Sequence, residues 1–174
     1  MNNVYFTKLA TPTVEIATTF ERWENDAELI PFIRPNRSKQ ELEQHMPVTV
    51  DGLTQRLIHS HIYLIYFEGQ LIGEMNYQVD PQHLLKKEQG SAWIGINIGE
   101  KIGRHKGIGS HALQYLETQI KLHGLKRIEL GVFEFNAPAL KLYKKLGFIE
   151  IGRVADFTFW NDRMWQDIRM EKYL

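Results

Sequence analysis

The chain contains no cysteine among its 174 residues. Without thiols it forms no disulfide, has no thiolate nucleophile, and cannot build the sulfur-ligated zinc sites that stabilise many small domains. Its seven histidines are scattered, and the one close pair, His59 and His61, is predicted to have a packing or surface role. The sequence therefore predicts no metal site, and any covalent catalysis would need a nucleophile other than sulfur.

The chain also lacks a surplus of either charge, with 21 basic and 21 acidic side chains. A protein that binds nucleic acid usually carries excess basic residues, because much of its affinity comes from releasing the counterions of the phosphates. The local exception is the group Lys101, Arg104, His105 and Lys106. A basic group confined to one turn favours a small phosphorylated ligand, and we expect no nucleic-acid partner.

Long apolar runs are absent too, since none reaches the roughly 20 residues that a membrane-spanning helix requires. The first residues, MNNVYFTKLATPTVEI, do not show the basic region and apolar block with which a secretory signal begins. We therefore expect a cytoplasmic protein without a membrane partner. No linker, repeat or low-complexity tract divides residues 1–174, so the length predicts a single domain.

Residue composition and hydrophobic periodicity predict a first strand at 4–10, helices from about residue 13 to residue 60, and a strand-rich α/β (α+β) arrangement after them. Residues 62–67 and 70–79 have the composition of a β-hairpin, with Glu68-Gly69 as its turn. A polar loop follows. The remaining predicted elements are a strand at 91–98, a helix at 108–123, a strand at 125–133, a helix at 136–146, and closing strands at 148–154 and 164–171.

The most informative segment is the basic, glycine-bearing turn between the strand 91–98 and the helix 108–123. Gly107 and Gly109 allow backbone N–H groups to approach an anion closely, and the start of a helix points free N–H groups and a positive dipole the same way. Arg104 and Lys106 add positive charge. This combination predicts a pyrophosphate-binding turn, whereas the plainer interpretation is a loop that merely turns.

A dinucleotide-binding fingerprint is the competing interpretation of the same turn. Gly107-Ile-Gly109-Ser-His-Ala112 fits the pattern G-x-G-x-x-A, and Glu129 lies 20 residues after Gly109. In that fold, however, the glycine turn follows its strand directly, whereas residues 99–106 intervene here. We therefore favour the first interpretation.

A second motif follows one helix and one strand later: Asn136-x-x-Ala139-x-x-Leu142-Tyr143-x-x-x-Gly147-Phe148. Together with Arg104-x-x-Gly107-x-Gly109, in this order, it resembles the GNAT family of acyl-CoA-dependent N-acyltransferases. The resemblance covers residues 62–154. It implies a single GNAT-fold domain with a mixed, mostly antiparallel, partly splayed sheet flanked by helices.

The resemblance further implies that acetyl-CoA is the co-substrate, lying between the strands 91–98 and 125–133, with no metal involved. Its pantetheine would pair with the edge of the first strand, and a backbone N–H near Ile98 would stabilise the oxyanion. The implied cofactor contacts are the backbone of Ile96 and Ile98, the turn residues Arg104, His105, Lys106, Gly107, Ile108, Gly109 and Ser110, and Asn136. Tyr143 would act as the general acid that protonates the leaving thiolate.

Some of these residues also have plainer roles. Tyr143 stands at helical spacing, where an aromatic residue is often part of the core, and Asn136 is a favourable N-cap for its helix. His105 replaces a glycine that is frequent in the family. We expect the turn to tolerate it, because histidine adopts the left-handed region more readily than most residues.

Glu74 is our candidate for the general base that takes the proton of the attacking amine. It lies on the polar face of the strand 70–79, beside the strand that would hold the cofactor. The plainer interpretation is a strand carboxylate that faces solvent. Glu100 and Asn97 are the alternatives.

We thus interpret the chain as an N-acetyltransferase in which a primary amine attacks acetyl-CoA directly. The alternative is a non-catalytic acyl-CoA-binding or sensing module of the same fold. The acceptor, a small-molecule or peptide amine, could be a polyamine, an antibiotic, an amino acid or a protein N-terminus. Its pocket should come from residues 20–60 and the closing strands, and the protein should be a monomer or homodimer.

Overall fold

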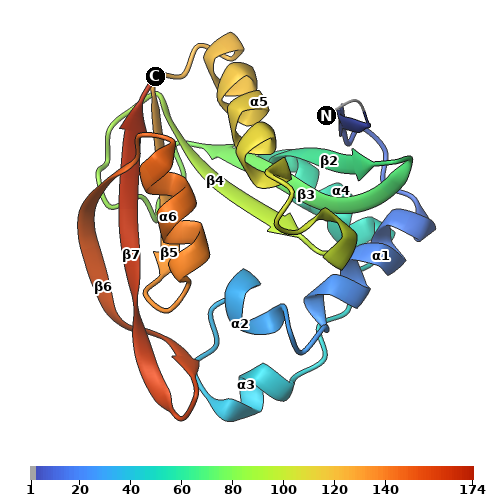
Figure 1. Ribbon diagram of the computed structural model, residues 1–174, viewed down its shortest axis with the longest axis horizontal. Coiled ribbons are helices and arrows are strands. Elements are labelled where there is room, and N and C mark those ends of the chain that lie inside the picture. The colour runs from blue at the N-terminus through green and yellow to red at the C-terminus, as the bar shows by residue number, and fades with distance from the viewer. Residues whose placement is uncertain (1–2) are drawn as a thin grey trace. The chain divides into compact units, whose positions relative to one another are not determined.

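The computed structural model describes residues 3–174 and contains one seven-stranded mixed sheet in the order β1-β2-β3-β4-β5-β7-β6 (Figure 1). The strands are β1 (Val4–Lys8), β2 (His61–Phe67), β3 (Gln70–Val79), β4 (Ser91–Ile98), β5 (Arg127–Phe133), β6 (Ile149–Trp160) and β7 (Arg163–Tyr173). The helices are α1 (Val14–Glu24), α2 (Ile30–Ile33), α3 (Lys39–Glu43), α4 (Val50–His59), α5 (Ile108–Leu122) and α6 (Ala137–Lys145), with a 3₁₀ turn at Lys101–Gly103. The predicted fold class is confirmed.

The chain divides into two compact units. The first contains Met1–Thr11, Thr54–Glu129 and Tyr173–Leu174, and the second contains Pro12–Leu53 and Leu130–Lys172. Each unit holds some of the predicted site residues. The turn, the strand β4 and Glu74 belong to the first unit, whereas Asn136 and Tyr143 belong to the second.

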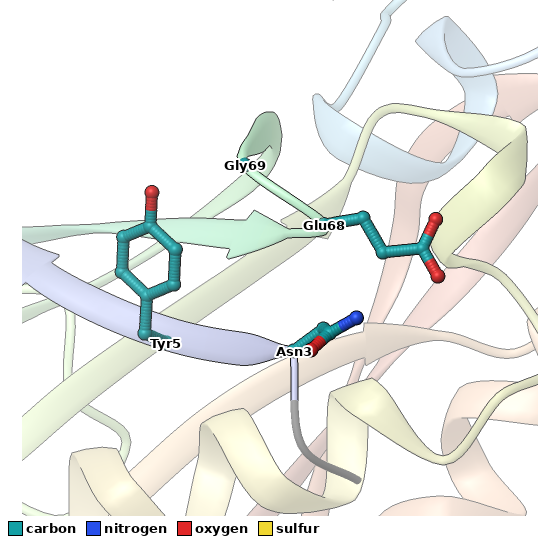
Figure 2. A pocket seen from close by; sticks show the side chains of 4 residues that line it. All are labelled: Asn3, Tyr5, Glu68 and Gly69. Atoms are coloured by element: carbon teal, nitrogen blue, oxygen red, sulfur yellow. The ribbon is translucent and has the colours of Figure 1, made fainter.

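In the first unit, β1, β2, β3 and β4 pair antiparallel in sequence. The predicted hairpin turn between β2 and β3 is confirmed, because Glu68 and Gly69 both have positive φ, at 51° and 80°. The Glu68 N–H donates to the Asn3 carbonyl at 2.9 Å. Asn3, Tyr5, Glu68 and Gly69 line a hollow beside this turn (Figure 2), which contains none of the predicted site residues.

The core of the first unit lies where α5 packs on the sheet. Its fully buried side chains include Met75 of β3 and Leu113, Leu116 and Ile120 of α5. The helix ends where the sequence predicts, because Gly124 has a φ of 83° and donates its N–H to the Lys121 carbonyl at 2.9 Å. This packing sets the direction in which the first turn of α5 points.

Side chains cap two helices at the start of the second unit. Thr13 caps α1, and the Ser38 Oγ accepts from the Glu41 N–H at 3.3 Å at the start of α3. The strand predicted at 148–154 is wrong in length, because β6 extends to Trp160. Its register shifts between Val154 and Thr158, where Asp156 has a φ of 49°, and this irregularity breaks the alternation on which the prediction relied.

Within residues 3–174, no helix is both long and apolar enough to cross a membrane. Across the same residues, no three histidine or acidic side chains are grouped so that they could hold a metal ion. His61, for which we predict a packing or surface role, stacks on Tyr77 with ring centroids 4.5 Å apart. Burial, followed by the charges of Lys8 and His123, lowers the pKa of His61.

Candidate functional site

The turn before α5 has the backbone shape of an anion site. His105 and Gly107 are both left-handed, with φ values of 59° and 75°, so the expectation that His105 tolerates this conformation is confirmed. Gly107 is the N-cap of α5 and offers no side chain to the helix. The N–H groups of Ser110 and His111 bond to the Gly107 carbonyl, at 3.1 and 3.3 Å.

The N–H groups of Ile108 and Gly109 have no hydrogen-bond partner among residues 3–174. A helix start normally satisfies such groups with a capping side chain, with water or with a ligand. Here they coincide with the positive end of the dipole of a 15-residue helix. The turn can therefore accept an anion such as a phosphate through its backbone.

The two basic side chains of the turn differ in what they contact. The Arg104 guanidinium donates to backbone carbonyls at the end of β4, from Nε to Ile98 at 3.3 Å and from Nη2 to Gly99 at 2.8 Å. The Lys106 Nζ lies 5.6 Å from the centre of the Phe67 ring. Arg104 therefore ties the turn to β4, while Lys106 is held loosely by a cation–π contact.

Beyond its third residue, the second edge of β4 is paired with no strand of the described chain, and the Ile98 carbonyl on it accepts from Arg104 Nε. The strand pairs with β5 in parallel only at Ser91, Ala92 and Trp93. The Ser91 carbonyl accepts from Asp80 on the β3 side, at 2.9 Å. Because backbone groups alternate along a strand, those of Ile96 and Ile98 point away from β3. Within the described chain no strand pairs with this edge after Trp93, so an extended ligand can add to it.

Glu74 is not the solvent-facing carboxylate of the plainer interpretation. It is in register with Asn97 of β4, and its side chain is only 13% exposed. Nη2 of Arg56, from the last turn of α4, donates to both carboxylate oxygens, at 2.7 and 3.0 Å. The sequence analysis missed Arg56, because 18 residues separate it from Glu74 and only the fold brings them together. A base role for Glu74 must operate beside this ion pair.

Asn136 caps α6 in the second unit, as the plainer interpretation expects. Its Oδ1 accepts from the Ala139 N–H at 3.3 Å. Its Nδ2 donates to no residue of the part of the chain that is described, so the amide N–H groups can still bind a ligand. Asn136 can therefore serve both the helix and a cofactor.

Tyr143 lies on α6 and is 8% exposed. Its ring packs edge-on against Phe148, with centroids 5.8 Å apart. Burial raises the pKa of Tyr143 to about 12. The phenol therefore carries its proton throughout the physiological range, as a proton donor must. Since a thiol has a pKa of about 8.5, complete proton transfer is less favourable than from an ordinary tyrosine.

The dinucleotide interpretation is contradicted by the position of Glu129. This residue is fully buried, it forms an ion pair with Arg127, and it accepts from the backbone N–H groups of Leu85 and Lys86. A carboxylate in this position cannot reach the ribose of a nucleotide, for which that fingerprint requires it.

The second unit also contains a hollow of 460 Å³ formed by the segments from which we expect the acceptor pocket. It is lined by residues between Asn25 and Glu43 and by Trp160 at the end of β6. The sequence analysis named these ranges but not the individual lining residues, and the acceptor pocket stays a prediction.

Curated proteins of known sequence match part of the chain. The chain is 33% identical over 85 residues to a probable spermine N(1)-acetyltransferase of Bacillus subtilis subsp. natto (strain BEST195). The match covers 48% of this chain and 56% of that protein, so the chain spans about half the length of this curated relative.

Solved structures match over nearly the whole chain. An N-acetyltransferase from Staphylococcus aureus Mu50 has a TM-score of 0.73 at 20% identity, with 99% of both chains covered. A putative acetyltransferase from Salmonella typhimurium, solved with its cofactor acetyl-CoA, has a TM-score of 0.75 at 15% identity, with 99% of this chain and 95% of that chain covered. At these identities the likeness shows the fold alone.

A family model described as "Acetyltransferase (GNAT) family" matches residues 20–148. The matched segment includes the turn, the strand β4, Glu74, Asn136 and Tyr143, and it spans well over half of the 174 residues. The chain therefore belongs to the GNAT acetyltransferase family.

Proposed function

We propose that this protein is an N-acetyltransferase that transfers an acetyl group from acetyl-CoA to a primary amine. The observation that carries the proposal is the free edge of β4 directly before an uncapped helix start, within one compact unit. The edge suits an extended pantetheine, which carries amide groups, and the turn suits a pyrophosphate. The family, the name of the spermine-acetylating relative and the acetyl-CoA-bound neighbour support the same reaction.

Each predicted residue then has a distinct task. When bound, acetyl-CoA supplies an activated acetyl thioester. The Ile98 N–H would donate to the thioester oxygen as negative charge develops there, and Ile96 would hold the extended arm. The N–H groups of Ile108 and Gly109 would bind phosphate oxygens, with Lys106 adding charge and Arg104 fixing the turn to β4. Asn136 would donate to the cofactor through Nδ2.

The proton transfers would follow from direct attack, because the chain has no cysteine to form an acyl-enzyme. The amine nitrogen forms a bond to the acetyl carbon, the carbon–sulfur bond breaks, and the amine loses one proton. Tyr143 would donate a proton to the leaving sulfur, and Glu74 would accept the proton from the amine through water. We hold the single-domain organisation and the monomer or homodimer state as predictions alongside this mechanism.

The Gly109→Asp variant tests acetyl-CoA binding. Gly109 lies in the first turn of α5 and is not among the residues with positive φ, so aspartate adds no backbone strain there and the fold should survive. Its carboxylate would repel phosphate at the N–H groups. We expect acetyl-CoA affinity, measured by isothermal titration calorimetry, to fall more than about tenfold, which is roughly 1.4 kcal/mol.

Gly52→Asp is the matched control, because it places the same side chain in the first turn of a different helix, α4. Its acetyl-CoA affinity should equal that of the wild type. An unchanged affinity in Gly109→Asp, with an intact circular dichroism spectrum, would remove the turn from the proposed site.

The Glu74→Gln variant tests the proposed base. Wild-type kcat/KM should rise with pH to a plateau as the amine loses its proton. The variant keeps the shape of the side chain but cannot accept a proton. We expect its kcat/KM to fall by about 10²-fold below neutrality, with the loss shrinking as free amine becomes abundant. The measurement is CoA release between pH 6 and 10.

Glu68→Gln, at the exposed β2–β3 turn, is the control and should follow the wild-type profile. If Glu74→Gln gives a parallel profile with near-equal rates, the ion pair with Arg56 is structural and the base lies elsewhere, with Glu100 the next candidate.

A non-catalytic acyl-CoA sensor of the same fold is the second candidate function. It requires the turn and the edge of β4 but has no use for a proton donor at Tyr143. The two functions differ in one observable. A sensor would bind acetyl-CoA and release no CoA with any amine, whereas the proposed enzyme would release CoA in proportion to the acetylated amine.

A further inference from the structure

The hollow in the second unit is mainly apolar. Its lining residues are Asn25, Ala27, Ile30, Pro31, Lys39, Leu42, Glu43 and Trp160. Ile30 and Pro31 come from α2, Leu42 from α3 and Trp160 from the end of β6, so three separate segments contribute the walls. A volume of 460 Å³ is in the range of small-molecule sites, which are also mostly apolar with few polar groups.

Aromatic side chains continue from Trp160 beyond the hollow. The Trp160 ring lies 6.4 Å from Phe135, which in turn lies 5.6 Å from Phe32 and 5.3 Å from Trp165. Phe32 is 44% exposed, and the other three are partly exposed. The guanidinium of Arg163 already stacks on Trp165 at 3.4 Å. This surface therefore offers apolar and aromatic contact, while the Trp165 ring already holds a cation of the protein itself.

The charges around the hollow cancel. Lys39 and Glu43 both come from α3, and neither side chain forms a hydrogen bond or ion pair with another residue in the described part of the chain. The Asn25 side chain is already hydrogen-bonded within the protein, to the Glu21 carbonyl and to the N–H and carbonyl of Met46. The Glu43 carboxylate is thus offset by the Lys39 ammonium, so these two lining residues give the hollow no net charge that would attract a cation.

We propose that this hollow binds the non-reacting body of the acceptor, and that the acceptor is a monoamine with an aromatic or branched hydrocarbon body. The inference rests on the proposed function. It differs from what the name of the spermine-acetylating relative suggests for an acceptor. A polyamine carries several charges along its chain. Placing them against Ile30, Leu42 and Trp160 would remove their water, and the Glu43 carboxylate, already offset by Lys39, cannot compensate for this loss of solvation energy.

The first experiment compares 2-phenylethylamine with spermidine as acceptors, by CoA release under identical conditions. We expect kcat/KM for 2-phenylethylamine to exceed that for spermidine at least tenfold. In parallel, tryptophan fluorescence measures the binding of each amine without acetyl-CoA, because Trp160 lines the hollow. Equal or better use and binding of spermidine would overturn the inference.

Two variants connect the result to the hollow. Trp160→Ala removes the aromatic wall but keeps the backbone carbonyl that accepts from Trp165 Nε1 at 2.8 Å, so the hairpin contact should remain. We expect KM for 2-phenylethylamine to rise at least tenfold with acetyl-CoA affinity unchanged. Leu42→Asp adds a carboxylate to the wall. It should therefore weaken the binding of 2-phenylethylamine and strengthen the binding of spermidine, which reverses the preference between the two amines.

Leu122→Ala, at a 77% exposed position in the first unit, is the control and should change neither the KM nor the binding of either amine. The outcomes separate the two proposals. Failure of the proposed function would appear as no acetyl-CoA binding, or as no CoA release with any amine. In that case the fluorescence titrations would still show whether the hollow binds 2-phenylethylamine more tightly than spermidine. Normal acetyl-CoA binding together with no effect of either variant would refute the inference alone.

Discussion

Tyr143→Phe should lower kcat by roughly 10²–10⁴, the usual contribution of a positioned general acid. The substitution removes only the hydroxyl, so the ring can keep its edge-on contact with Phe148. Acetyl-CoA affinity should therefore remain near the wild-type value. Because burial raises the pKa of Tyr143 to about 12, the hydroxyl is protonated throughout the assay range. The fold loss should accordingly be the same at every pH between 6 and 10, as measured by CoA release.

Tyr115→Phe provides the matched control, because Tyr115 is also a helical tyrosine packed against aromatic rings, Phe6 and Tyr63, but belongs to α5. It should retain wild-type kcat. A Tyr143→Phe variant with wild-type turnover would make Tyr143 a packing residue and leave water as the proton donor. A loss that disappeared at low pH would also contradict the assignment, because solvent acid would then replace the phenol.

The raised pKa also refines what the hydroxyl can contribute. A phenol with a pKa of about 12 holds its proton more tightly than a thiol with a pKa of about 8.5. Its main benefit is then a hydrogen bond to the sulfur as negative charge develops, with full transfer following as the products separate. Such a bond acts in the transition state, so its removal should affect kcat rather than KM.

The parts of the candidate site that sequence could predict are those set by neighbouring residues. A left-handed Gly107, a helix start at Ile108 and an N-cap at Asn136 follow from a few consecutive side chains, and all are present. The hairpin turn at Glu68-Gly69 has the same local origin. Each depends on backbone preferences that a short segment carries with it wherever it lies.

The parts that sequence could not predict are contacts between distant segments. The ion pair between Arg56 and Glu74 joins α4 to β3, and the sequence around neither residue indicates which partner it has. The bonds from the Arg104 guanidinium to the carbonyls of Ile98 and Gly99 are closer in the chain, but they too depend on how the turn folds back on β4. The end of the β4–β5 pairing at Trp93, which frees the edge of β4, is likewise a property of the assembled sheet.

Tertiary context explains the fate of Glu129 as well. Its spacing from Gly109 fits the dinucleotide pattern. However, Glu129 and Arg127 are two residues apart on β5, so both side chains lie on the same buried face. The pair secures the loop between β3 and β4. Arg127 Nη1 donates to Ser91 Oγ at 3.0 Å, and Glu129 accepts from Leu85 at 2.6 Å and from Lys86 at 3.3 Å. A structural role therefore accounts for every contact of Glu129.

Glu129→Gln should lower the free energy of unfolding by about 3–5 kcal/mol, the cost of leaving one member of a buried ion pair uncompensated. Glutamine keeps the volume and can still accept from one backbone N–H, so the loss comes from the unpaired guanidinium of Arg127, which is 1% exposed. Urea unfolding followed by circular dichroism measures the change. Arg127→Met should also destabilise the protein, because it leaves the carboxylate buried without its cation.

The double variant Arg127→Met/Glu129→Gln distinguishes charge pairing from simple loss of packing. If the buried pair is responsible, the double variant should lose clearly less free energy of unfolding than the sum of the two single losses. It contains neither charge, so no charge is left buried without its partner. Glu150→Gln serves as the control, since its partner Arg153 lies three residues away on an exposed strand, and screening by water makes that pair weak. Additive losses in the double variant, or a loss in Glu150→Gln as large as in Glu129→Gln, would show that burial of the pair does not set its contribution.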